Sequence, residues 1–465
     1  MNGHSKVKIR TVLILLLVLL PGFLTLQTLY ATNLPYLSIS LSATQAALTK
    51  TIDVSGLLTG AATSAKGGTV DYNLFSGGSC SGSIVTTKTV PVPTVKNGQA
   101  QLPKSTFTMS SAGTFSFQGV FHPKVTDSND YPATSECSAP VKVAGTTTTV
   151  KTTLSKTTIS LGKSLTDSAT LTSGTNKGSA TGTVTYDLFF GSTCSGGLVQ
   201  SQTLTVVTAG TLPASNPFTI NNAGTYSLHA VYSGDSKNAG STSSCEGPIT
   251  VTPLTPVLGI LLSASTITVG QTVSAAATLT GVTSTAGGTV KYEAFGGGVC
   301  GGAASDSFTV TVTNGVVPDS KNFIITSAGS GLVSFKAVYS GDKNNALATS
   351  SCMPVTIKKT TTSLSTSLST FSISAGGFVT DTATLGGATS GAGGTVLFEL
   401  YSDGACGGSG GSIVQSQTVT VTGGSVPSVS FTISTSGSYS IAAIYSGDSN
   451  NKGVTSGCEG VITVT

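Results

Sequence analysis

Residues 223–235 read Ala-Gly-Thr-Tyr-Ser-Leu-His-Ala-Val-Tyr-Ser-Gly-Asp, and this stretch decides the fold. Tyr226, Leu228, Ala230 and Tyr232 lie two residues apart, the spacing of a β-strand with one buried face. The strand runs into Ser-Gly-Asp, a combination typical of turns. Copies of this strand and turn occupy residues 331–342 and 437–448. The pattern therefore indicates a repeated β unit.

A second strand signature lies upstream of the first and recurs with the same period. Gly-Thr-Val, an alternating residue and an aromatic residue recur at 68–72, 182–186, 288–292 and 394–398. Val and the aromatic residue again share one face of a half-buried strand. Because this signature occurs four times, we expect four units with a period of about 106 residues.

The eight cysteines follow the same period, one pair in each unit. The spacings within successive pairs are 57, 51, 52 and 52 residues. C-x-x-C spacing and neighbouring histidines are absent from the sequence, which argues against zinc and redox sites. We therefore expect structural disulfides formed within each unit, each clamping the loop after the upstream strand to the start of the last strand. The cysteines are Cys80, Cys137, Cys194, Cys245, Cys300, Cys352, Cys406 and Cys458.

The body of the chain is rich in Ser, Thr and Gly and carries no amphipathic helical pattern. Several short strands in each hundred residues, separated by turn residues, predict an all-β fold of tandem β-sandwiches. A unit of this size can bury a core of its own. We expect four domains, at 36–145, 146–252, 255–358 and 359–465; these ranges are called repeats 1 to 4 below.

The recurring strand that ends in Tyr-Ser-Gly-Asp resembles the bacterial Ig-like domain repeats of exported prokaryotic proteins. The resemblance covers the chain after about residue 36, and it implies an Ig-like Greek-key sandwich used as a stalk, spacer or adhesive module, not for catalysis. Antibody-type domains carry a Trp against their disulfide, whereas this chain has no Trp. Repeat 1 also departs from the pattern, since residues 121–130 replace the Tyr-Ser-Gly-Asp turn.

The N-terminus has the pattern of an export signal. Lys6, Lys8 and Arg10 precede a long uncharged apolar run, and the next charged residue is Lys50. Residues 1–31 are interpreted as a cleaved signal peptide or a retained membrane anchor, because the run is long enough for either. Both alternatives place the body outside the cell, and only this segment would contact the membrane.

Candidate chemistry is sparse. The formal charge of +4 includes the three basic residues of the leader, so the body lacks the basic face that a nucleic-acid binder needs. The sequence contains no recognisable nucleophile with a histidine partner and no cofactor motif. We therefore expect no enzymatic activity. His229 is interpreted as a solvated side chain. His122 lies near Asp127 and Asp130 in sequence, but one histidine and two loop carboxylates fall short of a metal-ligand set. The loops at Asp235, Asp342 and Asp448 are interpreted as turns, with weak calcium binding as the alternative.

These observations predict a non-enzymatic structural or stalk protein of the cell surface or the extracellular medium. The alternative is an adhesin that binds a glycan or a surface protein through one Ig-like domain. Partners would then be cell-envelope components, other surface proteins or glycans. A third reading, the accessory array of an enzyme, would need a segment outside the repeats that could hold a catalytic domain, and none remains.

Overall fold

The computed structural model describes residues 34–62, 65–124 and 131–465. The chain divides into two compact units, Met1–Val251 and Thr252–Thr465. Repeat 1 and all but the last residue of repeat 2 belong to the first unit, and repeats 3 and 4 to the second. The expected leader, residues 1–31, lies outside the described residues. In the part that is described, no helix has the length and apolar character needed to cross a membrane.

Repeat 3 shows the architecture. Its first sheet pairs β21 (Val257–Leu262) with β24 (Ala275–Thr280), and β23 (Thr272–Val273) with β27 (Phe323–Ile324). Its second sheet has the order β22-β30-β28-β25-β26, with β29 beside β28. The strands of the second sheet are β22 (Thr266–Thr268), β25 (Thr289–Gly296), β26 (Asp306–Thr311), β28 (Leu332–Tyr339), β29 (Ala348–Thr349) and β30 (Met353–Lys358).

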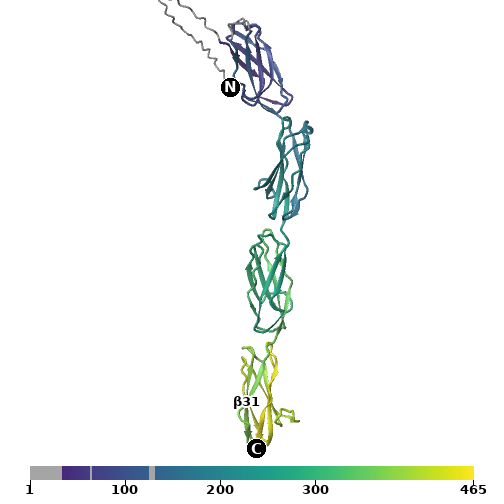
Figure 1. Ribbon diagram of the computed structural model, residues 1–465, viewed down its shortest axis with the longest axis vertical. Helices are drawn as coiled ribbons and strands as arrows, with labels where there is room; N and C mark the ends of the chain where they lie inside the picture. The colour runs from purple at the N-terminus through teal and green to yellow at the C-terminus, as the bar shows by residue number, and fades with distance from the viewer. Residues whose placement is uncertain (1–33, 63–64, 125–130) are drawn as a thin grey trace, which may run out of the picture. The chain divides into compact units, whose positions relative to one another are not determined.

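Repeat 4 has the same arrangement, and Figure 1 shows its two sheets face to face, with β31 labelled. The first sheet has the order β31-β33-β36 and the second the order β32-β39-β37-β34-β35. The strands are β31 (Ser363–Leu368), β32 (Ser372–Ile373), β33 (Gly377–Gly386), β34 (Thr395–Tyr401), β35 (Ile413–Thr420), β36 (Val429–Ile433), β37 (Gly437–Tyr445), β38 (Val454–Thr455) and β39 (Glu459–Val464).

Repeat 2 follows the same plan, with β11-β14 and β13-β17 facing the sheet β12-β20-β18-β15-β16. Its elements are β11 (Thr149–Leu154), β12 (Thr158–Ser160), β13 (Ser164–Leu165), β14 (Asp167–Ser173), the 3-10 helix η2 (Lys177–Ser179), β15 (Thr183–Phe190), β16 (Leu198–Thr205), β17 (Phe218–Thr219), β18 (Gly224–Tyr232), β19 (Ser241–Thr242) and β20 (Glu246–Thr252).

Repeat 1 keeps this order, although its turn after β8 is not among the described residues. One sheet runs β1-β3-β6, with β7 beside β3, and the other runs β2-β10-β8-β4-β5. The strands are β1 (Tyr36–Leu41), β2 (Gln45–Ala47), β3 (Thr51–Thr59), β4 (Thr69–Ser76), β5 (Ile84–Pro91), β6 (Gln99–Gln101), β7 (Ser105–Thr108), β8 (Gly113–His122), β9 (Ala133–Thr134) and β10 (Val141–Ala144).

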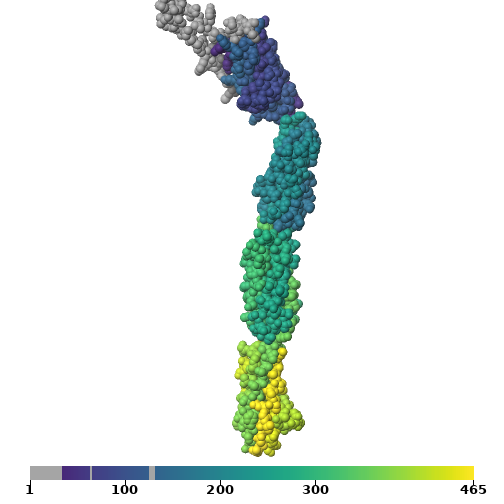
Figure 2. Space-filling view, viewed as in Figure 1, coloured from purple at the N-terminus to yellow at the C-terminus, as the bar shows by residue number. Residues whose placement is uncertain are grey.

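The alternation of apolar and polar residues in the sequence determines which side chains form the cores. Tyr226, Leu228, Ala230 and Tyr232 of β18 are at most 2% exposed, as the spacing predicted. The cores of repeats 1, 3 and 4 each form a cluster made only of that repeat's own side chains. Figure 2 shows only the surface of the repeats, with repeat 4 in green and yellow, and these core side chains lie beneath it. Each of these three sandwiches thus buries apolar area without help from a neighbour.

A buried tyrosine hydroxyl ties the two sheets together in three of the repeats. Tyr186 donates to the Pro213 carbonyl at 2.7 Å, and Tyr292 donates to the Pro318 carbonyl at 2.8 Å. Tyr72 reaches the Pro103 carbonyl at 3.5 Å. In repeat 4, Phe398 takes this position without a hydroxyl group. Each bond satisfies a polar group that burial would otherwise leave unpaired.

The strand order is that of an Ig-like Greek-key sandwich. In repeats 1, 3 and 4 a short strand near the start pairs in parallel with the last strand, for example Thr266 with Thr356 and Ser372 with Thr463. The other pairs in these sheets are antiparallel. Every strand pair in the described part of the chain joins strands of one repeat. The all-β fold expected from the sequence is therefore confirmed.

Each repeat is closed by one disulfide. The bonds join Cys80 to Cys137, Cys194 to Cys245, Cys300 to Cys352 and Cys406 to Cys458, with Cα–Cα distances of 5.6 to 5.7 Å. The first cysteine of each pair lies in the loop after β4, β15, β25 or β34, and the second lies just before the last strand. The bridge therefore clamps that loop to the end of the sandwich.

We predict that removing one bridge loosens one repeat only. The double substitution Cys406→Ser/Cys458→Ser releases a loop of 52 residues, which costs about 4 kcal/mol in the chain-entropy description. Hydrogen–deuterium exchange should rise in β37 and β39 and stay unchanged in β18 and β28, because the cores are separate. Equal loss of protection in all repeats would contradict this expectation.

Candidate functional site

The recurring Ser-Gly-Asp turn is the feature that the repeats share outside their cores. It follows β18, β28 and β37 in repeats 2, 3 and 4. Gly234, Gly341 and Gly447 have φ values of 77°, 73° and 70°, a region that L side chains rarely adopt. The glycine turns the chain back, so that the following aspartate points into the turn it has just formed.

The carboxylate of Asp342 is surrounded by donors. Its Oδ1 accepts from the backbone N–H groups of Asn344 at 2.7 Å and Asn345 at 3.0 Å. Its Oδ2 accepts from the Gly287 N–H at 2.8 Å and lies 3.2 Å from the Tyr339 hydroxyl, whose nearer acceptor is the Gly287 carbonyl at 2.8 Å. The Asn345 amide donates to both oxygens, at 2.9 and 3.0 Å. Both oxygens are thus saturated by groups of the same repeat.

Repeats 2 and 4 reproduce this arrangement. Asp235 accepts from the Thr181 N–H, and Asp448 accepts from the Gly393 N–H, each at 2.7 Å. The amides of Asn238 and Asn451, both nearly inaccessible, contact their aspartates as Asn345 does. Burial opposes ionisation, but the donors outweigh it and hold the pKa of Asp448 down at about 2. The pKa values of Asp235 and Asp342 are lowered for the same reason.

The turn also holds the segment by which the chain enters each repeat. The Leu254 N–H donates to the Asn344 carbonyl at 2.9 Å, and the Ala346 N–H donates to the Leu254 carbonyl at 2.8 Å. Thr146 and Thr360 make the same pair of bonds, with residues 237 and 239 and with residues 450 and 452. These backbone bonds form an isolated β-bridge between the incoming segment and the buried asparagine of the turn. The Asp turn is therefore an anchor for the incoming chain.

This geometry supports the turn interpretation of these loops over the calcium alternative. A calcium ion needs several oxygen ligands with free lone pairs, whereas these carboxylates face N–H and O–H donors. Among the described residues, no three His, Cys, Asp or Glu side chains are grouped as metal ligands would be. What the arrangement does chemically is fix the backbone.

A second cluster was not anticipated from the sequence. Asp167 is 1% exposed and Asp381 is inaccessible, each on the core side of the first sheet. Burial and the neighbouring Glu246 raise the pKa of Asp167 to about 7, and burial and the neighbouring Glu459 do the same for Asp381. Oδ2 of Asp167 and Oε2 of Glu246 have no hydrogen-bond partner. A pair of this kind is most stable when it holds one proton.

Repeats 1 and 3 lack this pair. In repeats 2 and 4, Asp167 and Asp381 pair with a leucine of the first strand. The residues that pair with the equivalent leucine in repeats 1 and 3 are Val54 and Ala275. The residue after the second cysteine is Glu246 or Glu459 in repeats 2 and 4, but Ser138 or Met353 in repeats 1 and 3. A signal was present in the sequence, since Asp-Ser/Thr-Ala-Thr-Leu and Cys-Glu-Gly occur together in repeats 2 and 4 only.

The two histidines of the body lie on outward strand faces. His229 is 3.4 Å from Asp187 across the strand pair β15–β18, and His122 is 3.1 Å from Asp71. At the strand position of His229 the other repeats carry Gln118, Lys336 and Ala442. The His122 side chain is 51% exposed, whereas that of His229 is only 20% exposed and Ala442, at the same strand position, is buried. The position of His229 is therefore half-buried, not the solvated one expected from the sequence.

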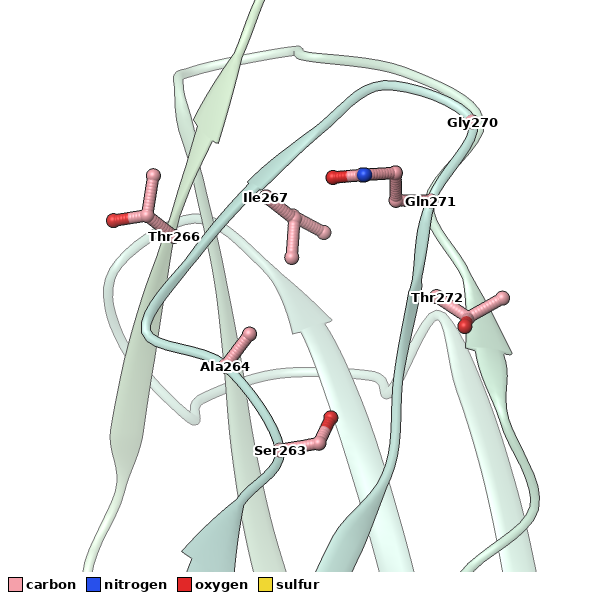
Figure 3. Close-up of a pocket in the computed structure, with 7 residues that line it drawn as sticks. All are labelled: Ser263, Ala264, Thr266, Ile267, Gly270, Gln271 and Thr272. Carbon is pink, nitrogen blue, oxygen red and sulfur yellow. The ribbon is translucent and has the colours of Figure 1, made fainter.

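A hollow of about 460 Å³ opens at the end of repeat 3, between β21 and β23. Figure 3 shows Ser263, Ala264, Thr266 and Ile267 on one arm of the chain and Gln271 and Thr272 on the other, with Gly270 at the bend. The Gln271 side chain accepts from the Thr268 N–H at 2.9 Å, so its carbonyl oxygen is already used. The hollow is shallow and has no charged lining residue.

Comparisons with known proteins add resemblances but no family. Neither a protein-family model nor a curated protein matches the chain. Among solved structures, a tetra-tandem repeat from the extending region of a large adhesion protein is 18% identical, with a TM-score of 0.47, over 93% of this chain and all of that one. The ICAM-5 D1-D4 ectodomain fragment is 11% identical, with a TM-score of 0.27, over 92% and 100% of the two chains.

Elastase-activated Escherichia coli alpha-2-macroglobulin is 10% identical, with a TM-score of 0.17, over 93% of this chain and 44% of that one. All three TM-scores lie below 0.5. The Ig-like assignment therefore rests on the strand order of this chain itself.

We predict that Asp342→Asn destabilises repeat 3 by about 2 kcal/mol, because several buried donors lose a charged acceptor. Urea denaturation followed by hydrogen exchange in β28 measures the loss. The exposed Asp319 of the same repeat provides the matched control, and Asp319→Asn should change stability by less than about 0.5 kcal/mol. Equal effects of the two substitutions would contradict the anchor role of Asp342.

We predict that repeats 2 and 4 lose stability as pH rises from about 4 to about 7. The raised pKa means that the folded state binds the proton of Asp167 or Asp381 more tightly than the unfolded state does. The slope is on the order of 1 kcal/mol per pH unit. Asp381→Ala/Glu459→Met, which copies repeat 3, should remove the slope in repeat 4.

Hydrogen exchange in β33 at pH 5 and pH 8, corrected for intrinsic rates, measures this effect. The variant should gain protection at pH 8 and little at pH 5. Repeat 3 of the same molecule is the internal reference. A gain of the same size at both pH values would mean that the carboxyl pair does not titrate in this range.

Proposed function

We propose that the chain is a non-enzymatic spacer of the cell surface or the extracellular medium, made of four Ig-like domains at 36–145, 146–252, 255–358 and 359–465. The single observation that carries this proposal is the anchor at the start of repeats 2, 3 and 4. In each, one residue of the incoming segment forms hydrogen bonds through both its N–H and its carbonyl to the turn that Asp235, Asp342 or Asp448 closes. This joint transmits force from one repeat into the body of the next.

The strand order supports a load-bearing role. The short strands β12, β22 and β32 lie beside the last strands β20, β30 and β39 of the same repeats. In repeats 3 and 4 the two strands are parallel, so tension on the two ends of the repeat loads several hydrogen bonds in shear at the same time. Bonds loaded together resist more force than bonds that open one after another.

The disulfides support the same reading. Each bridge encloses 51 to 57 residues, about half of a repeat. Those residues cannot extend while the bridge holds, even if the sandwich opens. Four disulfides and no free cysteine in the described residues also favour an oxidising environment outside the cytoplasm. Export through residues 1–31, cleaved or retained, belongs to this proposal.

The test is to stretch the full chain by its two ends in optical tweezers. We expect separate unfolding events, each releasing about half of a repeat, and a roughly doubled increment after reduction, at about 3.5 Å per residue. Thr360→Pro removes the N–H that bonds to Asn450 and should lower the unfolding force of one event only. Extension without discrete events, or hydrolytic turnover abolished by one substitution, would overturn the proposal.

A further inference from the structure

Strand β21 of repeat 3 reads Val-Leu-Gly-Ile-Leu-Leu, six residues without a polar side chain. Leu258 points into the core and is 5% exposed. Val257 and Leu261 point the other way and are 68% and 71% exposed. A strand at the surface of a sandwich normally alternates apolar and polar residues. Strand β21 is therefore also apolar on its solvent-exposed face, which points away from the core of the repeat.

The other three repeats provide an internal comparison, because the first two long strands pair in the same register in repeats 1, 3 and 4, and in repeat 2 from Val150 onward. Leu258, Leu37, Val150 and Leu364 each face a buried or half-buried leucine. The outward positions around them are polar, apart from Tyr36. Where repeat 3 has Val257, Gly259 and Leu261, the others have Tyr36, Ser38 and Ser40, or Thr149, Lys151 and Thr153, or Ser363, Ser365 and Ser367.

The neighbouring strands extend this difference. Ala276 lies opposite Leu261, where the other repeats carry Ser55, Ser168 and Thr382. On β27, Ile324 is 64% exposed, where the others carry Thr108, Thr219 and Thr432. Repeat 3 thus has an apolar outward face made of Val257, Leu261, Ala276 and Ile324. The remaining outward residues of β24, Thr278 and Thr280, are uncharged.

Strand β21 is also a sheet edge. In the part of the chain that the structure describes, β24 is the only strand paired with it. Proteins usually protect such edges with charged residues or proline. Some other edges have these devices, namely Lys151 in β11, and Lys88 and Pro91 in β5. Strands β1 and β31 have neither a charged residue nor a proline, but serines fill most of their outward positions. On β16 and β35, Gln200 and Gln415 donate to the carbonyls of Thr219 and Thr432.

We propose that β21 is a self-association edge, which pairs in antiparallel fashion with β21 of a second copy of this chain. The sequence is self-complementary about Gly259. With the two Gly259 residues opposite each other, each Val257 faces the partner's Leu261, and each Leu258 faces the partner's Ile260. Such cross-strand apolar pairs stabilise a two-strand ladder. The two-fold axis makes the contact isologous and closed.

A second copy fits this edge better than a different partner. A partner recognised by charge would need a charged group on β21 or on the outward side of β24, and neither has one. Self-pairing brings identical groups close together, which an uncharged edge permits without repulsion. Gly259 also leaves room, since a Cβ built there would lie 3.8 Å from its nearest neighbour, the Thr278 carbonyl oxygen.

The contact is small, so the association is weak. A pair of six-residue strands buries less than about 1,200 Å², the lower limit of stable interfaces. We expect dissociation constants in the range of about 10 to 100 μM for two isolated chains. Neighbouring chains held at high local density, as on a surface, would associate at this strength.

Sedimentation velocity of the full chain between 1 and 200 μM tests the proposal. Val257→Thr/Gly259→Lys/Leu261→Thr copies repeat 2, so the residues are ones that this fold accepts, and it should weaken the dimer at least tenfold. Since residues outside β21 are identical in the two proteins, association through any other segment cancels in the comparison. A parent chain that stays monomeric, or a variant that dimerises equally, overturns the proposal.

A disulfide trap reports the register. Gly259→Cys places two thiols opposite each other at the two-fold axis, so mild oxidation should yield a covalent dimer on a non-reducing gel. Ser365→Cys introduces the thiol at the same strand position of repeat 4 and serves as the matched control, which should remain monomeric. Equal cross-linking of the two variants would mean that random collision, not pairing of β21, forms the dimer.

Discussion

The described repeats that carry the Ser-Gly-Asp turn depend on one electrostatic arrangement, an aspartate closed in by its own backbone. Asp342 accepts from Gly287, Asn344 and Asn345, groups that come from two segments of the repeat that are distant in sequence. A carboxylate can satisfy so many donors because it carries a full charge on two oxygens. Removing it would leave buried N–H groups unpaired and would free the incoming chain. The joint between successive repeats therefore rests on the same side chain as the turn.

The repeats can be compared with one another as variants of a common sandwich. They share the disulfide and the strand order, repeats 2, 3 and 4 also share the turn, and a few positions differ in charge or polarity. Repeats 2 and 4 hold a buried Asp–Glu pair in which burial and the neighbouring carboxylate raise the pKa of the aspartate, whereas repeat 3 has Ala275 and Met353 in its place. Repeat 3 alone carries leucine and valine on the outer face of its first strand. The strand order is thus common to the repeats, whereas the apolar outer face and the buried carboxyl pair belong to individual ones.

Much of the fold could be predicted from the sequence, because alternation and period are local properties. The face shared by Tyr226 and Tyr232, and the β-rich composition, follow from spacing alone. The candidate sites were predicted less well. The loop at Asp342 was legible as a turn, but its role in holding Leu254 depends on residues about 90 positions apart. The Asp381–Glu459 pair was missed because its members lie 78 residues apart and only the sheets bring them together.

The order of residues along the chain was sufficient to establish the all-β class and the period of the repeat, since strand alternation and turn chemistry act between neighbours. Its uncharged, histidine-poor composition also argued against nucleic-acid binding and triad chemistry. Three-dimensional packing decided which polar groups are buried together, which strand lies at an edge, and which face of β21 stays open. Those properties depend on contacts between segments distant in sequence, and a local pattern carries no information about what will lie opposite it.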